Sequence, residues 1–230
     1  MGAIKLKHTS GNGTILNSPA ANPSSDITLK LPSTTGSAGQ VLQVASANHS
    51  STNAELEFAA AAAGGISMID TYNLSSSQVM TGAQWNYVKS NFSRVNGSYG
   101  TMNVTGLGTG LTANNAGAAT NFSFPATGYY EITFTSCTYV SSSSSSDYLY
   151  AAIFVARDGS SFDNVLQSVN SIRGNSNTIY ETQVTKGIID VTNTTNDKFY
   201  LAVQPEVASV LLGANDKFYT YLQVKKLADT

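Results

Sequence analysis

The feature that most constrains this chain is a strict alternation of apolar and polar residues, clearest in 122–135, FSFPATGYYEITFT. Successive side chains of a β-strand point to opposite faces, so Tyr130, Ile132 and Phe134 are expected on one buried face and the residues between them on the other. The tetrapeptide PATG has the composition of a turn. The stretch therefore predicts a turn followed by a core strand of a larger β-structure.

Similar segments recur from residue 66 to the C-terminus. No stretch between them has the spacing of apolar residues that an amphipathic helix of useful length requires. The expected strands are 66–72, 84–95, 119–124, 129–139, 147–157, 164–173, 178–192, 198–206 and 217–227. The sequence therefore predicts an all-β domain.

Two of these strands share a sequence motif: NDKFYLAV at 196–203 and NDKFYTYLQV at 215–224. In both, Asn-Asp supplies a turn and Phe begins the alternation. The expected inward residues are Phe199, Leu201 and Val203 in the first strand and Phe218, Leu222 and Val224 in the second. We interpret the pair as two similarly built strands of one sandwich.

The segment 148–156, YLYAAIFVA, is apolar or aromatic on both sides. One face carries Leu149, Ala151, Ile153 and Val155, and the other carries Tyr148, Tyr150, Ala152 and Phe154. One face of a sandwich strand packs on the opposite sheet, so we expect a neighbouring subunit to cover the second. The candidate trimer interface comprises Tyr148, Tyr150, Phe154, Tyr200, Tyr219 and Tyr221.

The first 58 residues contain only short alternating pieces, which prolines interrupt. Ordering such a segment costs roughly 1 to 2 kcal/mol per residue in backbone entropy, more than its few apolar side chains return at about 1.5 to 3 kcal/mol each. Residues 1–58 are therefore expected to order only against other chains, as an attachment or stalk segment. The run AAAAAGG at 59–65 is interpreted as a linker, and 66–230 as the head domain.

Composition excludes several classes of partner. Charged residues make up 11% of the chain, against about 25% in typical soluble proteins, and the net charge is −2. Nucleic acid is an unfavourable partner for such a chain, and no apolar run is long enough for membrane insertion. The N-terminus lacks the apolar core of a secretory signal, and Cys137 stands alone, so we expect synthesis in a reducing cytoplasm.

No arrangement of residues predicts catalysis, a cofactor or a metal. His8 and His49 lie far apart in polar stretches, and GLGTG at 106–110 lacks the following helix that a phosphate-binding loop needs. Asp158 and Asp163 are a conceivable carboxylate pair for glycoside hydrolysis, but both lie in expected loops. We therefore expect a protein that is not an enzyme, and we name no catalytic, cofactor-binding or metal residue.

The stretch FSFPATGYYEITFT resembles the signature of the complement globular-head and tumour-necrosis-factor-like jelly rolls. YLYAAIFVARDG, TQVTKGIIDVTNTTNDKFYLAV and FYTYLQVKKL follow in the order of that family's later strands, so that the resemblance covers about 84–227. It implies an antiparallel jelly-roll β-sandwich that forms a homotrimer. The serine-rich loop 141–147 and the absence of a compact acidic cluster depart from the complement type, so calcium binding is not expected.

A narrower resemblance is to structural proteins of marine bacteriophages. QWNYVKSNFSRVNGSYG, LGTGLT and FSFPATGYY are similar to segments of their tail fibres and other appendages, and SSDITLKLPSTTGSAGQVLQV at 24–44 is similar to a unit of fibre stalks. The resemblance implies a virion structural protein that is made in the host cytoplasm.

We therefore expect a trimeric fibre or appendage subunit that contacts other virion proteins through residues 1–58. Its head could contact a glycan or protein of the host surface, for which exposed aromatic residues such as Tyr139 offer stacking surfaces. The first alternative is a capsid decoration or cement protein that stabilises the shell. A secreted recognition module of a host comes third, because the chain shows no secretory signal.

Overall fold

The computed structural model describes residues 3–7, 13–17, 28–45, 50, 53–60, 65–89, 91–95, 97–99, 102–104, 106–115, 119–140, 145–172 and 178–230. All the regular secondary structure in these residues is β-strand, so the predicted all-β class is confirmed. The chain divides into two compact units, Met1–Ala63 and Gly64–Thr230, and we call the second unit the head. The division falls inside the linker predicted at 59–65.

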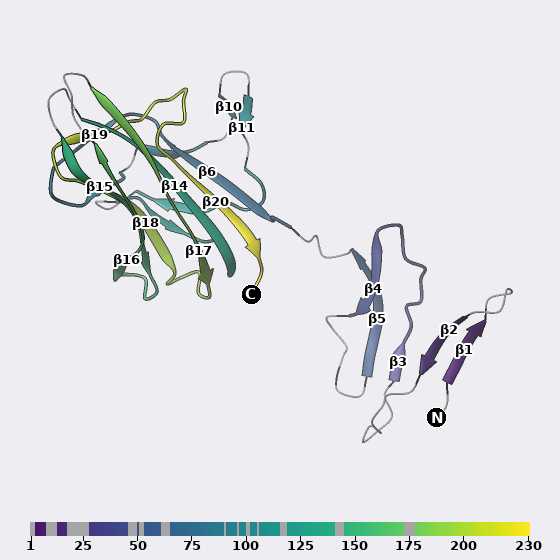
Figure 1. The fold of residues 1–230 in the computed structure, drawn as a ribbon. Helices are drawn as coiled ribbons and strands as arrows, with labels where there is room; N and C mark the ends of the chain where they lie inside the picture. Colours follow the sequence, from purple (N-terminus) through teal and green to yellow (C-terminus); the bar gives the residue numbers. More distant parts are fainter. Residues whose placement is uncertain are drawn as a thin grey trace. The chain divides into compact units, whose positions relative to one another are not determined.

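One sheet of the head contains four long antiparallel strands (Figure 1). In spatial order they are β6 (Met68–Leu74), β20 (Tyr221–Ala228), β14 (Gly128–Val140) and β17 (Ile179–Val191). Three short strands extend this sheet: β9 (Phe92–Arg94) pairs with β6, β19 (Ser209–Leu211) with β14, and β7 (Gln78–Met80) with β19. Among the described residues, strand β17 pairs only with β14 and so forms an edge of the sheet.

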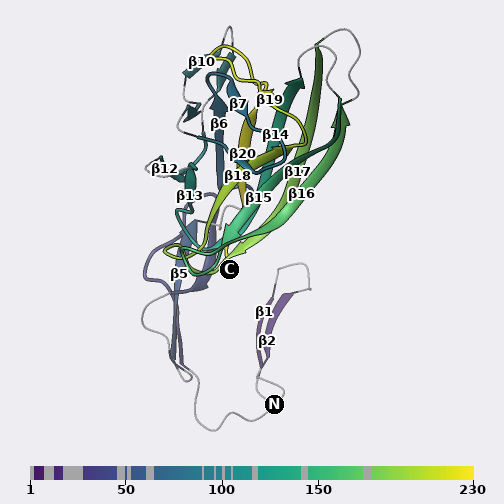
Figure 2. The same cartoon turned by 90° about the vertical axis from the view of Figure 1, so that its left-hand side faces the viewer.

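The second sheet contains, in spatial order, β12 (Thr112–Asn114), β13 (Asn121–Ser123), β18 (Lys198–Pro205), β15 (Ser146–Ala156) and β16 (Phe162–Ile172). The two-residue strand β8 (Asn86–Tyr87) pairs with β18. The long edge strands β16 and β17 run beside each other along one side of the sandwich (Figure 2).

The order of the principal strands is that of a jelly roll. Numbered one to eight in chain order, β6, β13, β14, β15, β16, β17, β18 and β20 give 1-8-3-6 in one sheet and 2-7-4-5 in the other. Apart from the hairpin of β15 and β16, strands that are neighbours in sequence thus alternate between the two sheets, which is how a jelly roll closes its core. The predicted antiparallel jelly-roll sandwich is confirmed.

The core lies between the two sheets and contains the aromatic residues around the PATG turn. Tyr130, Ile132 and Phe134 are each 0% exposed, as their alternation predicted. Phe122 stacks on Phe199, with ring centroids 4.9 Å apart, and Phe124 lies 4.7 Å from the ring of Tyr130. These aromatic residues therefore join strands of both sheets across the sandwich.

The inward face of the second repeated motif begins later than predicted. Leu222 and Val224 are fully buried on β20, but Phe218 lies in the turn before this strand and is only partly buried. Its predicted place on the inward face is wrong, because the turn after Asn-Asp is longer here than in the first motif.

The strand predicted at 84–95 is also wrong. Strand β8 pairs with β18 in one sheet and β9 pairs with β6 in the other, with the backbone N–H of Phe92 bonded to the carbonyl of Lys89 in the turn between them. The apolar residues of this stretch follow one another closely enough to resemble a single strand, yet they serve two sheets.

In the N-terminal unit, β1 (Ala3–Lys7) pairs with β2 (Gly13–Asn17). A separate sheet has the order β3 (Thr28–Lys30), β5 (Asn53–Ala60), β4 (Gln40–Val44), so the first alanines of the predicted linker belong to β5.

Strand β4 leaves apolar side chains exposed on both of its faces. Val41 and Leu42 point to opposite sides and are 43% and 50% exposed, and Val44 is 48% exposed. Neither side of this strand is buried by the described residues of the chain. The prediction that the segment orders only against other chains is untested and stays a prediction.

Candidate interaction surfaces

The outward side of the β15–β18 sheet carries a continuous group of aromatic rings, which we call the aromatic surface. It comprises Trp85, Tyr87, Tyr148, Tyr150, Phe154, Phe162 and Tyr200. Phe154 stacks on Tyr200 with centroids 4.9 Å apart, and Trp85 meets Phe154 edge to face at 5.1 Å. From Trp85 the group continues to Tyr150 at 6.3 Å, and from Tyr150 to Tyr148 at 5.1 Å.

The aromatic surface contains four of the predicted interface residues, Tyr148, Tyr150, Phe154 and Tyr200. The assignment of the other two to the same set is wrong. Tyr221 lies on β20 in the opposite sheet, where its ring contacts Phe218, and Tyr219 lies in the turn before that strand. The repeated NDKFY motif suggested one common face, but β18 and β20 belong to different sheets.

Sequence reasoning missed Trp85, Tyr87 and Phe162 as members of this surface. Trp85 and Tyr87 are two residues apart, so both side chains lie on one face of the extended chain. This spacing was the available signal, but with 84–95 assigned to a single strand the pair was not singled out. Phe162 begins β16, two residues before the expected start of that strand.

The centre of the aromatic surface is covered by the same chain. Ala152 is 0% and Phe154 9% exposed, because Trp85, Tyr87, Phe162 and Tyr200 pack around them. This corrects the expectation that a neighbouring subunit supplies the second cover of β15. Burial, and then the nearby Tyr87 hydroxyl, raises the pKa of Tyr200 to about 12. Tyr148 and Tyr150 are only half-buried, and a subunit contact there stays a prediction.

A second surface, on the outward side of the other sheet, combines tyrosine rings with aliphatic side chains. We call it the β17 face; it comprises Tyr129, Tyr139, Tyr180, Val184 and Ile188. On β17, Tyr180 is 57%, Val184 53% and Ile188 61% exposed. On the neighbouring β14, Tyr139 lies directly opposite Tyr180, with ring centroids 5.3 Å apart.

Glu131, Lys186 and Lys225, on this side of the sheet, form ion pairs with one another. The ammonium Nζ of Lys186 lies 2.8 Å from one carboxylate oxygen of Glu131, and that of Lys225 lies 3.4 Å from the other. Hydrogen bonding from Lys186, above all, and then from Lys225 holds the pKa of Glu131 below its usual value. Because these groups already have partners within the sheet, they oppose contact with another apolar surface less than isolated charges would.

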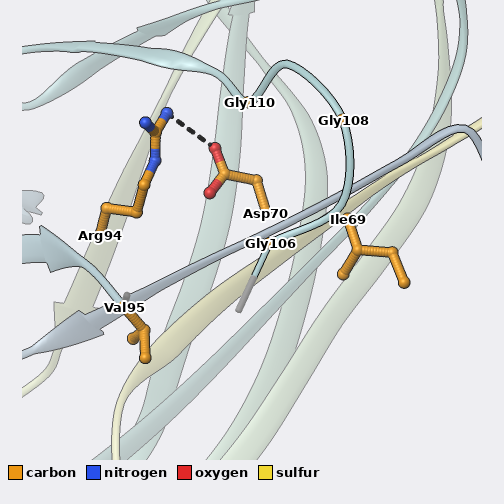
Figure 3. A pocket seen from close by; sticks show the side chains of 7 residues that line it. All are labelled: Ile69, Asp70, Arg94, Val95, Gly106, Gly108 and Gly110. Carbon is orange, nitrogen blue, oxygen red and sulfur yellow. Dashed lines mark hydrogen bonds and ion pairs between the residues drawn. The ribbon is translucent and has the colours of Figure 1, made fainter. Parts of the chain in front are cut away.

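A pocket of about 200 Å³ lies at the rim of the sandwich beneath the glycine-rich loop (Figure 3). Asp70, only 2% exposed, accepts hydrogen bonds from the Leu111 backbone N–H at 2.7 Å and from the Arg94 guanidinium at 3.0 Å. The same guanidinium nitrogen donates to the hydroxyl of Tyr72 and to the carbonyl of Leu111. Burial, assisted by the negative Asp70, raises the pKa of Tyr72.

The glycines of GLGTG are required by the close approach of this loop to β6 and the residue before it. Gly108 has a φ of +68°, and a Cβ there would lie 2.4 Å from the carbonyl oxygen of Ser67. A Cβ on Gly110 would lie 2.3 Å from a carboxylate oxygen of Asp70. The loop is thus held by its own chain, which accounts for the glycine pattern without a phosphate ligand.

We expect Gly110→Ala to destabilise the head by about 2 kcal/mol, because the new methyl group displaces the buried Asp70 carboxylate from its donors. Thermal unfolding followed by circular dichroism measures the loss. The control is Thr109→Ala in the same loop, an exposed position where the change should stay within about 0.5 kcal/mol. Equal melting temperatures for the two variants would contradict this account of the loop.

The remaining chemical groups singled out in the sequence have structural partners or lie outside the described residues. Asp158 accepts hydrogen bonds from the backbone N–H groups of Ser160 and Ser161, which cap its turn and lower its pKa. His8 and His49 lie outside the described residues.

In the described part of the chain, no group of three or more His, Cys, Asp or Glu could hold a metal ion. Among those same residues, no helix is long and apolar enough to cross a membrane.

No known protein family and no curated protein matches this sequence. Among solved structures, the chain is similar to the Eiger TNF of S. frugiperda, with 15% identity and a TM-score of 0.45 over 73% of this chain and 95% of that one. It is also similar to murine APRIL in its crystal structure at pH 5.0, with 12% identity and a TM-score of 0.44 over 69% of this chain and 99% of the other. The jelly-roll assignment follows from the strand order of the chain itself.

Proposed function

We propose that this protein is a non-enzymatic structural protein of a virus particle, a homotrimeric fibre or appendage subunit whose N-terminal unit attaches it and whose jelly-roll head is displayed. The observation that supports this most strongly is that both units leave apolar surface without cover from the residues that the structure describes. In the head this is the β17 face, and in the N-terminal unit it is both sides of β4. Exposed apolar side chains grouped on one face of a sheet favour contact with other chains.

The β17 face suits a contact between identical subunits. Val184 and Ile188 are aliphatic, lie on one side of an edge strand and are each more than half exposed. Burying such side chains is favourable by about 25 cal/mol per Å² of apolar surface. We therefore place the proposed subunit contact here, and not on the aromatic surface, whose centre the chain itself covers. A homotrimer is the assembly that the resemblance to complement-head and tumour-necrosis-factor-like jelly rolls implies.

The N-terminal unit suits a stalk or docking segment. Strand β4 exposes Val41 and Leu42 on opposite sides, so that one partner could cover each side of the sheet. In a homotrimer the neighbouring copies, or other virion proteins at the point of attachment, would supply that cover. The resemblance of 24–44 to phage fibre stalks favours the same role, and a virion location follows from it.

Electron cryomicroscopy of the purified particle tests this function. The fibre reading predicts threefold density for the chain at an appendage, with the head outermost. Density spread over the shell lattice would contradict it and support the alternative, a capsid decoration or cement protein that joins neighbouring shell subunits. Absence of the chain from the particle would overturn both.

A further inference from the structure

The aromatic surface differs in chemistry from the β17 face. Its exposed part is formed mainly by aromatic rings, because Tyr148, Tyr150 and Trp85 are only half-buried. Each of these rings contacts another, and Trp85 also rests edge to face on the buried Phe154. The rings therefore have fixed orientations before any partner binds.

Amide side chains flank these rings in register. Across the β16–β15–β18 sheet, Asn164 lies opposite Phe154 and Gln167 opposite Ala152, while Gln204 lies opposite Tyr150 from the other side. Side chains that pair across neighbouring strands in this way point to the same face of the sheet. Amides both donate and accept hydrogen bonds.

The outward positions around Tyr150, Ala152 and Phe154 carry no charged residue among those the structure describes, and Lys198, opposite Ala156, lies at the end of the same row on β18. On β15 these positions are Tyr148, Tyr150, Ala152 and Phe154; on β18 they are Tyr200, Ala202 and Gln204; on β16 they are Asn164, Gln167 and Val169. None of the residues paired with Tyr150, Ala152 and Phe154 is a cation that could hold an anionic ligand. The combination of aromatic rings and neutral amides instead matches a neutral molecule that has apolar C–H faces and a rim of hydroxyl groups.

We propose that the aromatic surface binds a neutral glycan, with sugar rings stacked on Tyr148, Tyr150 and Trp85 and sugar hydroxyls bonded by Gln204 and Gln167. The stacked rings lose little conformational freedom on binding, since packing already orients them. The inference deepens the proposed contact of the head with a host surface and rests on that function for the biological source of the glycan. A second protein chain is disfavoured because few large aliphatic side chains are exposed on β16 beside the rings, namely Val169 and, at the bulge, Val165.

The chain has a single tryptophan, and it lies in this surface, so its fluorescence reports on binding here. The full chain is titrated with cellohexaose, maltohexaose, chitohexaose, mannohexaose and agarohexaose while Trp85 emission is recorded. We expect a saturable change with at least one of these sugars. Tyr150→Ala should weaken that binding about tenfold, and Tyr150→Phe, which keeps the ring, should stay within about threefold of the parent.

Light scattering of the same samples separates this inference from the proposed function. A mass of three chains with no response to any sugar overturns the glycan site and leaves the trimer standing. A single-chain mass with a response that Tyr150→Ala abolishes supports the glycan site and contradicts the trimer. A response that survives Tyr150→Ala overturns the assignment to this surface. Loss of assembly in Tyr150→Ala also overturns it, because the surface would then be a subunit contact.

Discussion

A glutamate in place of Val184 should leave the head as a folded monomer. Val184 is 53% exposed at the middle of the β17 face, so a carboxylate there is tolerated in a single chain and becomes buried and unpaired in an assembly. An unpaired charge at a buried contact costs about 3 to 5 kcal/mol, which weakens each contact about a hundredfold to a few thousandfold. Analytical ultracentrifugation over a range of concentrations measures the change.

The matched control is Val165→Glu. Val165 is also a strand valine and is 55% exposed, but it lies on β16 in the other sheet. The same substitution there should leave the oligomeric mass unchanged. If Val165→Glu dissociates the assembly and Val184→Glu does not, the subunit contact lies on the other sheet.

Replacing Phe122 by alanine should have the largest effect on the stability of the head. Phe122 is 1% exposed, and its ring contacts Tyr72 at 5.0 Å and Phe199 at 4.9 Å. Removing a buried phenylalanine leaves a cavity between the two sheets and costs about 3 to 5 kcal/mol. For a domain of this size the melting temperature should fall by about 10 °C.

Two further variants control this prediction. Phe122→Leu retains most of the buried volume and should cost about half as much. Thr127→Ala alters an exposed residue of the adjoining turn and should leave the melting temperature almost unchanged. Equal losses in Phe122→Ala and Thr127→Ala would show that the ring does not join the two sheets as described.

The strands themselves could be predicted from the sequence because the alternation is local. Tyr130, Ile132 and Phe134 are buried as their period of two requires, and the ends of β14, β15 and β17 fall within one residue of the expected limits. What the alternation does not contain is the partner of each strand. Pairing depends on contacts between residues far apart in the chain, such as β6 with β20.

The candidate surfaces were harder to predict from the sequence, for the same reason. Tyr200 ends the first NDKFY motif and Tyr221 comes two residues after the second, yet they lie on opposite sheets, and only the pairing of β18 and β20 separates them. The exposed β17 residues also alternate along their strand, but a single sequence does not distinguish an inward from an outward apolar row. The role of Gly108 depends on its approach to Ser67, a backbone contact that no local pattern encodes.

We propose that the β17 face joins three copies of the head. Sedimentation equilibrium of residues 64–230 tests it most directly, because the mass it gives does not depend on molecular shape and the head contains its own core. We expect a mass of three chains at micromolar concentration, falling to that of one chain in Val184→Glu. A cooperatively folded head with the mass of a single chain throughout the concentration range would contradict it.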